Sequence, residues 1–309
     1  MFNSELINAV ENFSALMLPL SEKELDREWT WKDHDEEGIR FAFFVTIQEL
    51  RQLAVLLTST RRTPLTQAQH ILGQYHKQYL DLQAVIFGIS KEESERAPND
   101  GEWAIRQAYA HILGAEFSFR AVIRYALERH RDAQWTPERI PKPEYPRLYG
   151  INESEYELLM EGPLDAMLAY HHELHPSIIQ EFSNITDHEL DLPAAFWEET
   201  RFPIRHRLHR FEAHIIQHTV QIDKTLAAVS QTPSESKRLI RYLFSALAEV
   251  NAKMIGSDNY PTGGSELAKN INLRVREIQS ALRELNTTTK GPRRLIAVLS
   301  LILQISFCA

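Results

Sequence analysis

The chain of 309 residues is 43% hydrophobic and 25% charged, so it can bury a core and lacks the composition of a disordered chain. Its formal net charge of −8 argues against a nucleic-acid partner, because phosphate binding needs a basic surface, and the sequence has no basic stripe. With a single cysteine, Cys308, and a start that does not resemble a signal peptide, the chain fits a reducing compartment, and we expect a cytoplasmic protein.

Apolar residues recur at helical spacing along almost the whole chain, and no run shows the alternation or the β-branched density of a strand. We therefore predict an all-α protein. The expected helices, in chain order, span residues 3–17, 37–60, 66–88, 104–129, 154–183, 205–230, 234–252 and 264–286, with a ninth at 293–306. Gly162-Pro163 is expected to kink or split the helix at 154–183, because proline interrupts helical hydrogen bonding.

The four long helices between residues 66 and 230 predict a four-helix bundle, which we assign to residues 65–231. The N-terminal flank, 1–64, and the C-terminal flank, 232–290, contribute four more amphipathic helices. These additional flanking helices either form a second bundle around which the central one is inserted, or lie against the first.

The last segment, 291–309, ends in an apolar tail of 15 residues, short of the ~20 residues that a membrane span needs. We therefore expect a terminal helix that is buried in the protein or in a partner chain. A short membrane anchor is the alternative.

Two histidines, His214 and His218, lie four residues apart within the helix at 205–230. Residues at this spacing share one face of a helix, so both imidazoles can reach a single metal ion. Both lie beside the apolar stripe of the helix, whereas His206 and His209 point away from it and are expected to be solvated.

A third histidine, His111, lies at the margin of the apolar stripe of the helix at 104–129, among small residues. Three histidines from two facing helices resemble a catalytic zinc site with one open position. The alternative is that these histidines bind carbonyls or carboxylates at the edge of the core, because helical pairs at this spacing are common. His171 and His175, also four apart, are rival ligands or a second site.

Glu116 falls inside the apolar stripe of the same helix, so its carboxylate must be paired or protonated. It lies about 140° from His111 around the helix, too far to join the same ion easily. Either it orients a ligand or acts as a general base, or it pairs with a buried arginine such as Arg207 or Arg210, which is the simpler hypothesis. The sequence has no glycine-rich phosphate loop and no nucleophile elbow.

Three segments together resemble the DinB/YfiT-like superfamily of bacterial metal-binding four-helix bundles: Gly101-Glu102-Trp103 before a helix, His111 to Glu116 within it, and Phe211-x2-His214-x3-His218-x2-Gln221-Ile222 on the last helix. The resemblance covers residues 66–230. It implies that His111, His214 and His218 bind a divalent metal ion, zinc or nickel. It also implies an up-down-down-up bundle with a long crossover, and dimerisation through the helices. Characterised relatives include thiol-dependent S-transferases and a thiol-dependent isomerase.

We therefore expect a metal-dependent transferase or hydrolase that activates a low-molecular-weight thiol or water at the open position of a three-histidine site. Its partners are then a small-molecule substrate and a second copy in a homodimer. Trp103, Tyr109 and Arg207 are the side chains expected within reach of the substrate. The alternative is a non-enzymatic helical scaffold, either metal-binding or an interaction protein.

Overall fold

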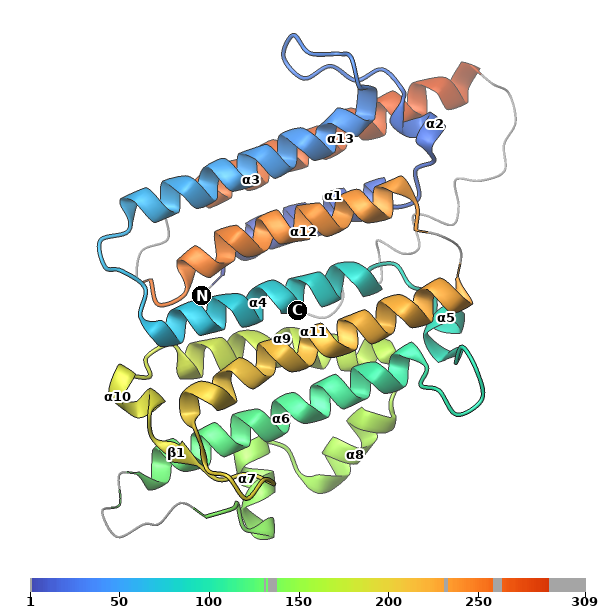
Figure 1. The fold of residues 1–309 in the computed structure, drawn as a ribbon. Coiled ribbons are helices and arrows are strands. Elements are labelled where there is room, and N and C mark those ends of the chain that lie inside the picture. The colour runs from blue at the N-terminus through green and yellow to red at the C-terminus, as the bar shows by residue number, and fades with distance from the viewer. Residues whose placement is uncertain (1, 131, 133–137, 231–232, 258–262, 289–309) are drawn as a thin grey trace.

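A computed structural model describes residues 2–130, 132, 138–230, 233–257 and 263–288. The long helices, in chain order, are α1 (Ser4–Met17), α3 (Phe41–Thr60), α4 (Gln67–Ile86), α6 (Ile105–Arg129), α9 (Leu164–Phe182), α11 (Ile204–Val229), α12 (Glu235–Met254) and α13 (Gly263–Thr288) (Figure 1). The shorter helices are α2 (Glu22–Leu25), α5 (Lys91–Glu95), α7 (Tyr145–Tyr149), α8 (Glu153–Glu161) and α10 (Asp187–Leu190), with 3-10 turns at Gly38–Arg40 and Lys142–Glu144. The strands β1 (Pro193–Ala194) and β2 (Phe202–Pro203) pair antiparallel. The predicted all-α class is confirmed.

The helix ends follow signals in the sequence. Thr66 caps α4: its hydroxyl accepts a hydrogen bond from the backbone N–H of Gln69, whose side chain accepts one from the N–H of Thr66 in return. The helix predicted at 154–183 is divided into α8 and α9 at Gly162-Pro163, as expected. The predicted helix at 293–306 and the apolar tail lie outside the described residues.

The central bundle consists of α4, α6, α9 and α11. Helix α11 packs against both α4 and α6, and α9 contacts the same two helices from the other side. Aromatic rings fill the contact between α4, α6 and α11: Phe211 lies 4.9 Å from Tyr75 and 5.5 Å from Phe119, measured between ring centroids. This arrangement places α6 and α11 side by side, and both carry the histidines singled out above.

The flanking helices form a second bundle. In it α12 packs against α3 and α1 against α13, while α1 also contacts α12 and α13 also contacts α3. The buried Arg274 of α13 donates hydrogen bonds to Thr46 Oγ1 at 2.7 Å and Glu49 Oε2 at 3.0 Å, which ties α13 to α3. The boundaries of separate domains at residues 64 and 231 stay predictions.

Helix α12 joins the two bundles, because it packs against α4 as closely as against α3. Figure 1 shows α3 and α13 as the outermost layer, α1 and α12 next to them, and then the central bundle. Residues Gly38–Thr60 are long and apolar enough to cross a membrane, a test that core helices of water-soluble proteins also pass. In the structure this segment contacts α12 and α13, whereas its residues Phe44, Val55 and Leu56 are exposed.

Candidate metal centre

Three predicted ligands, His111 of α6 and His214 and His218 of α11, come together at one point. Each ring offers one possible ligand nitrogen, and these three nitrogens all lie within 4.8 Å of one another. The two Nε2 atoms of His111 and His214 face each other at 3.1 Å. The structure therefore brings His111 to His214 and His218, the pair that the helical spacing nominated, although His111 lies about a hundred residues earlier in the sequence.

The histidine cluster lies at the edge of the core. His214 and His218 are buried, with 7% and 6% of their surfaces exposed, whereas His111 is exposed. Burial, together with the neighbouring His218 and His111 rings, lowers the pKa of His214 to about 3. Burial and His218 also lower the pKa of His111. Both rings are therefore neutral near pH 7, and a neutral imidazole offers the nitrogen lone pair that a metal ion needs.

The hydrogen bonds of the cluster match those of structural histidines at a core margin for one ring of the three. Nδ1 of His218 donates to Oε1 of Gln221 at 2.8 Å, while His111 and His214 contact each other. Nδ1 of His214 is buried and has no hydrogen-bond partner among the described residues. The alternative interpretation required carbonyl or carboxylate partners, and among the described residues His218 alone has one, the side-chain carbonyl of Gln221.

The donor set fits a divalent transition-metal ion. Imidazole nitrogen is a ligand that suits both zinc and nickel, and three such ligands leave one position open on a tetrahedral ion. Two nitrogens bound to one tetrahedral zinc lie about 3.3 Å apart. The 3.1 Å between the Nε2 atoms of His111 and His214 is close to that distance.

A cavity of about 530 Å³ opens next to the histidine cluster. Its lining includes His218 and Gln221 of α11, together with Trp103 from the loop before α6. The Trp103 ring lies 5.1 Å from that of His111 and 6.3 Å from that of His218, between centroids, and 40% of its surface is exposed. The volume is within the range of small-molecule sites.

Of the side chains expected within reach of a substrate, only Trp103 lies beside the cluster. Tyr109 is fully buried and contacts His171, with 2.7 Å between the hydroxyl oxygen and Nδ1. Arg207 is 1% exposed and pairs with Glu198 at 2.9 Å. The prediction was wrong for these two residues because both point into the core.

Glu116 takes neither of the two roles expected of it. Its Oε2 accepts a hydrogen bond from the Tyr75 hydroxyl at 2.8 Å and lies 2.9 Å from Nε2 of His171. These partners come from α4 and α9, inside the bundle, so pairing with Arg207 or Arg210 was the wrong hypothesis. The carboxylate belongs to a buried polar network that includes no member of the histidine cluster.

The rival histidines lie in the same buried region, away from the cluster. His171 contacts Glu116 and Tyr109, and His175 pairs with His76 at 2.9 Å between Nε2 and Nδ1. The partner His76 was not singled out in the sequence, where it is an isolated histidine without a partner at helical spacing. Its apolar neighbours on α4 are the only signal that it would be buried.

The other two histidines of α11 stay outside the cluster. His209 is exposed and faces Glu212 at 3.7 Å. His206 is half-buried rather than solvated, because its ring stacks on Phe202 at 4.2 Å between centroids. Helical phase therefore separated the two pairs of histidines correctly, but it missed the β2 residue that covers His206.

The fold and the cluster define a class of protein: an all-α four-helix bundle in which two facing helices bring three histidines to one point. Residues 74–222, about half of the chain, match the model of the DinB superfamily, and the match includes all three histidines. The match over this part of the chain confirms the resemblance to DinB/YfiT-like proteins. No curated protein and no solved structure matches the chain.

Proposed function

We propose that this protein is a metal-dependent enzyme in which His111, His214 and His218 hold a divalent ion, zinc or nickel. Its substrates are a low-molecular-weight thiol and an electrophile. The thiol loses its proton, its sulfur forms a bond to carbon of the electrophile, and the leaving group of the electrophile departs. Hydrolysis is the variant in which water replaces the thiol. One observation carries the proposal: three imidazoles converge next to a cavity large enough for a small molecule.

His111, His214 and His218 would hold the divalent ion, which would supply a Lewis acid that lowers the pKa of a thiol or a water at its open position. The chain itself must position the substrate and accept the proton that is released. Glu102 is the one carboxylate among the described residues that line the cavity, and Asn99 donates a hydrogen bond to it at 3.2 Å. We therefore assign Glu102 the role of proton acceptor.

The cavity also offers means of holding a substrate. Trp103 forms an aromatic wall beside His111 and His218, so it shields one side of the site from water. Lys224 is exposed and lines the same cavity, where its ammonium can attract the carboxylate of an acidic thiol. These features suit a small polar thiol rather than a macromolecule.

The alternative is a scaffold in which metal serves stability alone, with a fourth protein ligand closing the shell. The residues expected to supply that ligand were His171, His175 and Glu116. All three are engaged in the buried network described above. Among the described residues, the cluster therefore contains three ligands, which favours an open position.

The open position is tested with the Co²⁺-loaded protein. A thiol that binds the ion gives a sulfur-to-metal charge-transfer band, so we expect 2-mercaptoethanol to produce a new near-ultraviolet absorption band. The matched variant Glu102→Gln should keep the band, because Glu102 is not a ligand, and should lose thiol-transfer activity toward an alkylating electrophile. A Co²⁺ spectrum that does not change with thiol would support the scaffold.

A further inference from the structure

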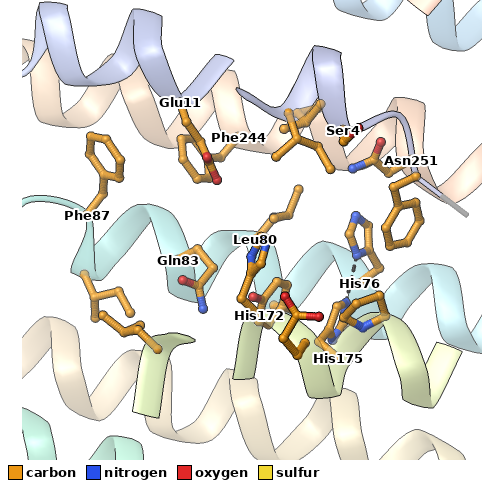
Figure 2. Close-up of a pocket in the computed structure, with 18 of the residues that line it drawn as sticks. Ser4, Glu11, His76, Leu80, Gln83, Phe87, His172, His175, Phe244 and Asn251 are labelled. Carbon is orange, nitrogen blue, oxygen red and sulfur yellow. Dashed lines mark hydrogen bonds between the residues drawn. The ribbon is translucent and has the colours of Figure 1, made fainter. Parts of the chain in front are cut away.

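A second cavity, of about 750 Å³, lies between the two bundles and is separate from the histidine cluster. Residues from α1 and α12 form one side of it and residues from α4 and α9 form the other (Figure 2). None of its lining residues lines the cavity beside Trp103. Its volume falls in the usual range for small-molecule sites, which often form between packed helices.

The charged lining of this interbundle cavity is acidic. Glu11, Asp165 and Glu173 contribute to it, and none of the described lining residues is a lysine or an arginine. The two buried histidines of the lining add no positive charge, because burial lowers the pKa of His76 to about 3 and that of His175 well below its ordinary value, and a third lining histidine, His172, is exposed. The cavity therefore repels anions and attracts cations.

Glu11 is the carboxylate on the α1 side of this cavity. Figure 2 shows it projecting from α1 near Phe87 and Phe244. It forms no ion pair with any other described residue. Burial raises the pKa of its carboxyl group, and the neighbouring His172 partly opposes that rise. A bound cation next to Glu11 would give this carboxylate the ion pair that no described residue forms with it.

The other end of the cavity carries buried polar atoms without partners. Asn251 and His76 are 1% and 2% exposed, and Asn251 Nδ2 and His76 Nε2 form no hydrogen bond among the described residues. Figure 2 shows these two side chains together, at the end opposite Glu11 and Phe87. Native proteins rarely leave such atoms unpaired, so the two nitrogens point to a ligand group that bonds with them.

The hydrogen bond between His76 and His175 defines what that ligand group must be. Nδ1 of His76 and Nε2 of His175 share one proton at 2.9 Å, so one of the two remaining ring nitrogens is a donor and the other an acceptor. Asn251 Nδ2 adds a donor. His76 Nε2 is therefore a donor or an acceptor according to which ring gives the shared proton, and a neutral amide, which can both accept and donate, matches this end in either case.

Between the two ends the walls are apolar. Leu80 of α4, Leu168 of α9 and Leu247 of α12 line the cavity, together with Phe2, Phe87 and Phe244. The ring of Phe2 stacks on that of His76 at 4.4 Å between centroids. An alkyl or aromatic segment would be buried here, and burial of apolar surface is favourable.

We propose that the interbundle cavity binds a small amphipathic organic cation. Its ammonium group lies beside Glu11, its apolar segment lies along the leucine and phenylalanine walls, and a neutral amide-like end bonds with Asn251 and His76. The ligand class is that of singly charged acylated alkylamines.

The charge preference is tested with a matched pair of probes, N-acetyl-1,6-diaminohexane and 6-acetamidohexanoate, which differ in the charge at one end. Binding is measured by saturation-transfer NMR and titration calorimetry. We expect the cation to bind at least about tenfold more tightly than the anion. The proposal would be overturned by equal affinities or by tighter binding of the anion. It would also be overturned if neither probe binds, which would mean that the cavity holds water only.

Substitutions of Glu11 and Asn251 then test where the two ends of the ligand bind. Glu11→Gln should lower the affinity for the cation about tenfold, whereas Glu5→Gln, which removes an exposed carboxylate from the same helix, should change it less than about twofold. Asn251→Leu should weaken binding of the acetylated diamine but not of hexylammonium, which lacks the amide. If Glu11→Gln and Glu5→Gln behave alike, or if Asn251→Leu weakens both probes equally, the assignment is wrong. Thermal unfolding confirms that each variant is folded.

This site does not depend on the metal centre. Because the two cavities share no lining residue, the cation should bind with unchanged affinity to a His214→Ala variant. Loss of binding in that variant would contradict a separate site. A protein that binds no metal could still bind the cation, so the two proposals fail independently.

Discussion

Gln221 holds His218 in one tautomer. The amide oxygen accepts a hydrogen bond from Nδ1 at 2.8 Å, so the proton sits on Nδ1 and the lone pair on Nε2. The two residues lie three positions apart on α11, which places them on one face of the helix. A ring fixed in this way keeps the lone pair of Nε2 available for a metal ion shared with His111 and His214.

Removing the hydrogen bond between Gln221 and His218 should weaken metal binding without abolishing it. We expect Gln221→Leu to lower the Zn²⁺ affinity about 10- to 100-fold, the usual effect of losing the hydrogen-bond partner of a ligating histidine. Competition with a chromogenic chelator measures the affinity. Gln217→Leu, at an exposed position on the same helix, is the control and should leave it unchanged. Equal effects of the two substitutions would show that Gln221 does not orient His218.

Trp103 should report the occupancy of the centre. Its ring lies 5.1 Å from that of His111, so a paramagnetic ion such as Co²⁺ bound there should quench its fluorescence. We expect most of the quenching to disappear in Trp103→Phe and to persist in Trp197→Phe, since Trp197 is 70% exposed and lines neither cavity. Quenching that survives in Trp103→Phe would place the ion near another tryptophan.

The long helices and the histidine cluster could be predicted from the sequence because both depend on local periodicity. Residues four apart share a helix face whatever the rest of the chain does, so His214 and His218 were paired without knowledge of the fold. His111 required a second step, that its helix faces theirs, and the contact between α6 and α11 provides it.

The contacts of Glu116 could not be predicted in the same way. Helical phase showed that the carboxylate is buried, but the choice of partner depends on which residues the other helices present at that level. These proved to be Tyr75 of α4 and His171 of α9. The short helices α2, α5, α7 and α10 and the strands β1 and β2 were missed because each has five residues or fewer, too few to show a period.

The buried pair of His76 and His175 should make the protein sensitive to acid. The pKa of His76 is about 3 in the folded protein, below the ordinary value of 6.5, so between these values the unfolded chain binds more protons than the folded one. The stabilisation is therefore complete above pH 6.5 and is lost as the pH falls toward 3.

Replacing His76 by glutamine should reduce this loss, because glutamine does not titrate. Between pH 6.5 and pH 5 the wild type should lose about 2 kcal/mol more of its free energy of unfolding than His76→Gln does. Urea denaturation at the two pH values measures the difference. His70→Gln, at an exposed position of the same helix, should behave as the wild type. A His76→Gln variant with unchanged acid sensitivity would mean that this ring is not neutral and buried.

Gly38 should be among the least replaceable glycines in the second bundle. Its φ of +60° lies in the left-handed region, and a Cβ would lie 2.3 Å from the carbonyl oxygen of Arg27, a backbone atom. Gly150 has a φ of +79° with nothing within 4 Å, so it shares the backbone conformation without the contact.

We expect Gly150→Ala to cost about 1 kcal/mol of unfolding free energy and Gly38→Ala about 3 kcal/mol or more. Chemical denaturation of both variants measures the difference. If the two variants lose equal stability, the turn before α3 is not held against the backbone of Arg27.

The central claim is that the three histidines bind one divalent ion, and metal content tests it most directly. After loading with Zn²⁺ and dialysis, mass spectrometry should find one ion per chain in the wild type and in His209→Ala, a control on the exposed side of α11. His214→Ala should lose this ion while remaining folded. If His214→Ala retains the same zinc content as the wild type, the ion is bound elsewhere and the assignment of the centre is wrong.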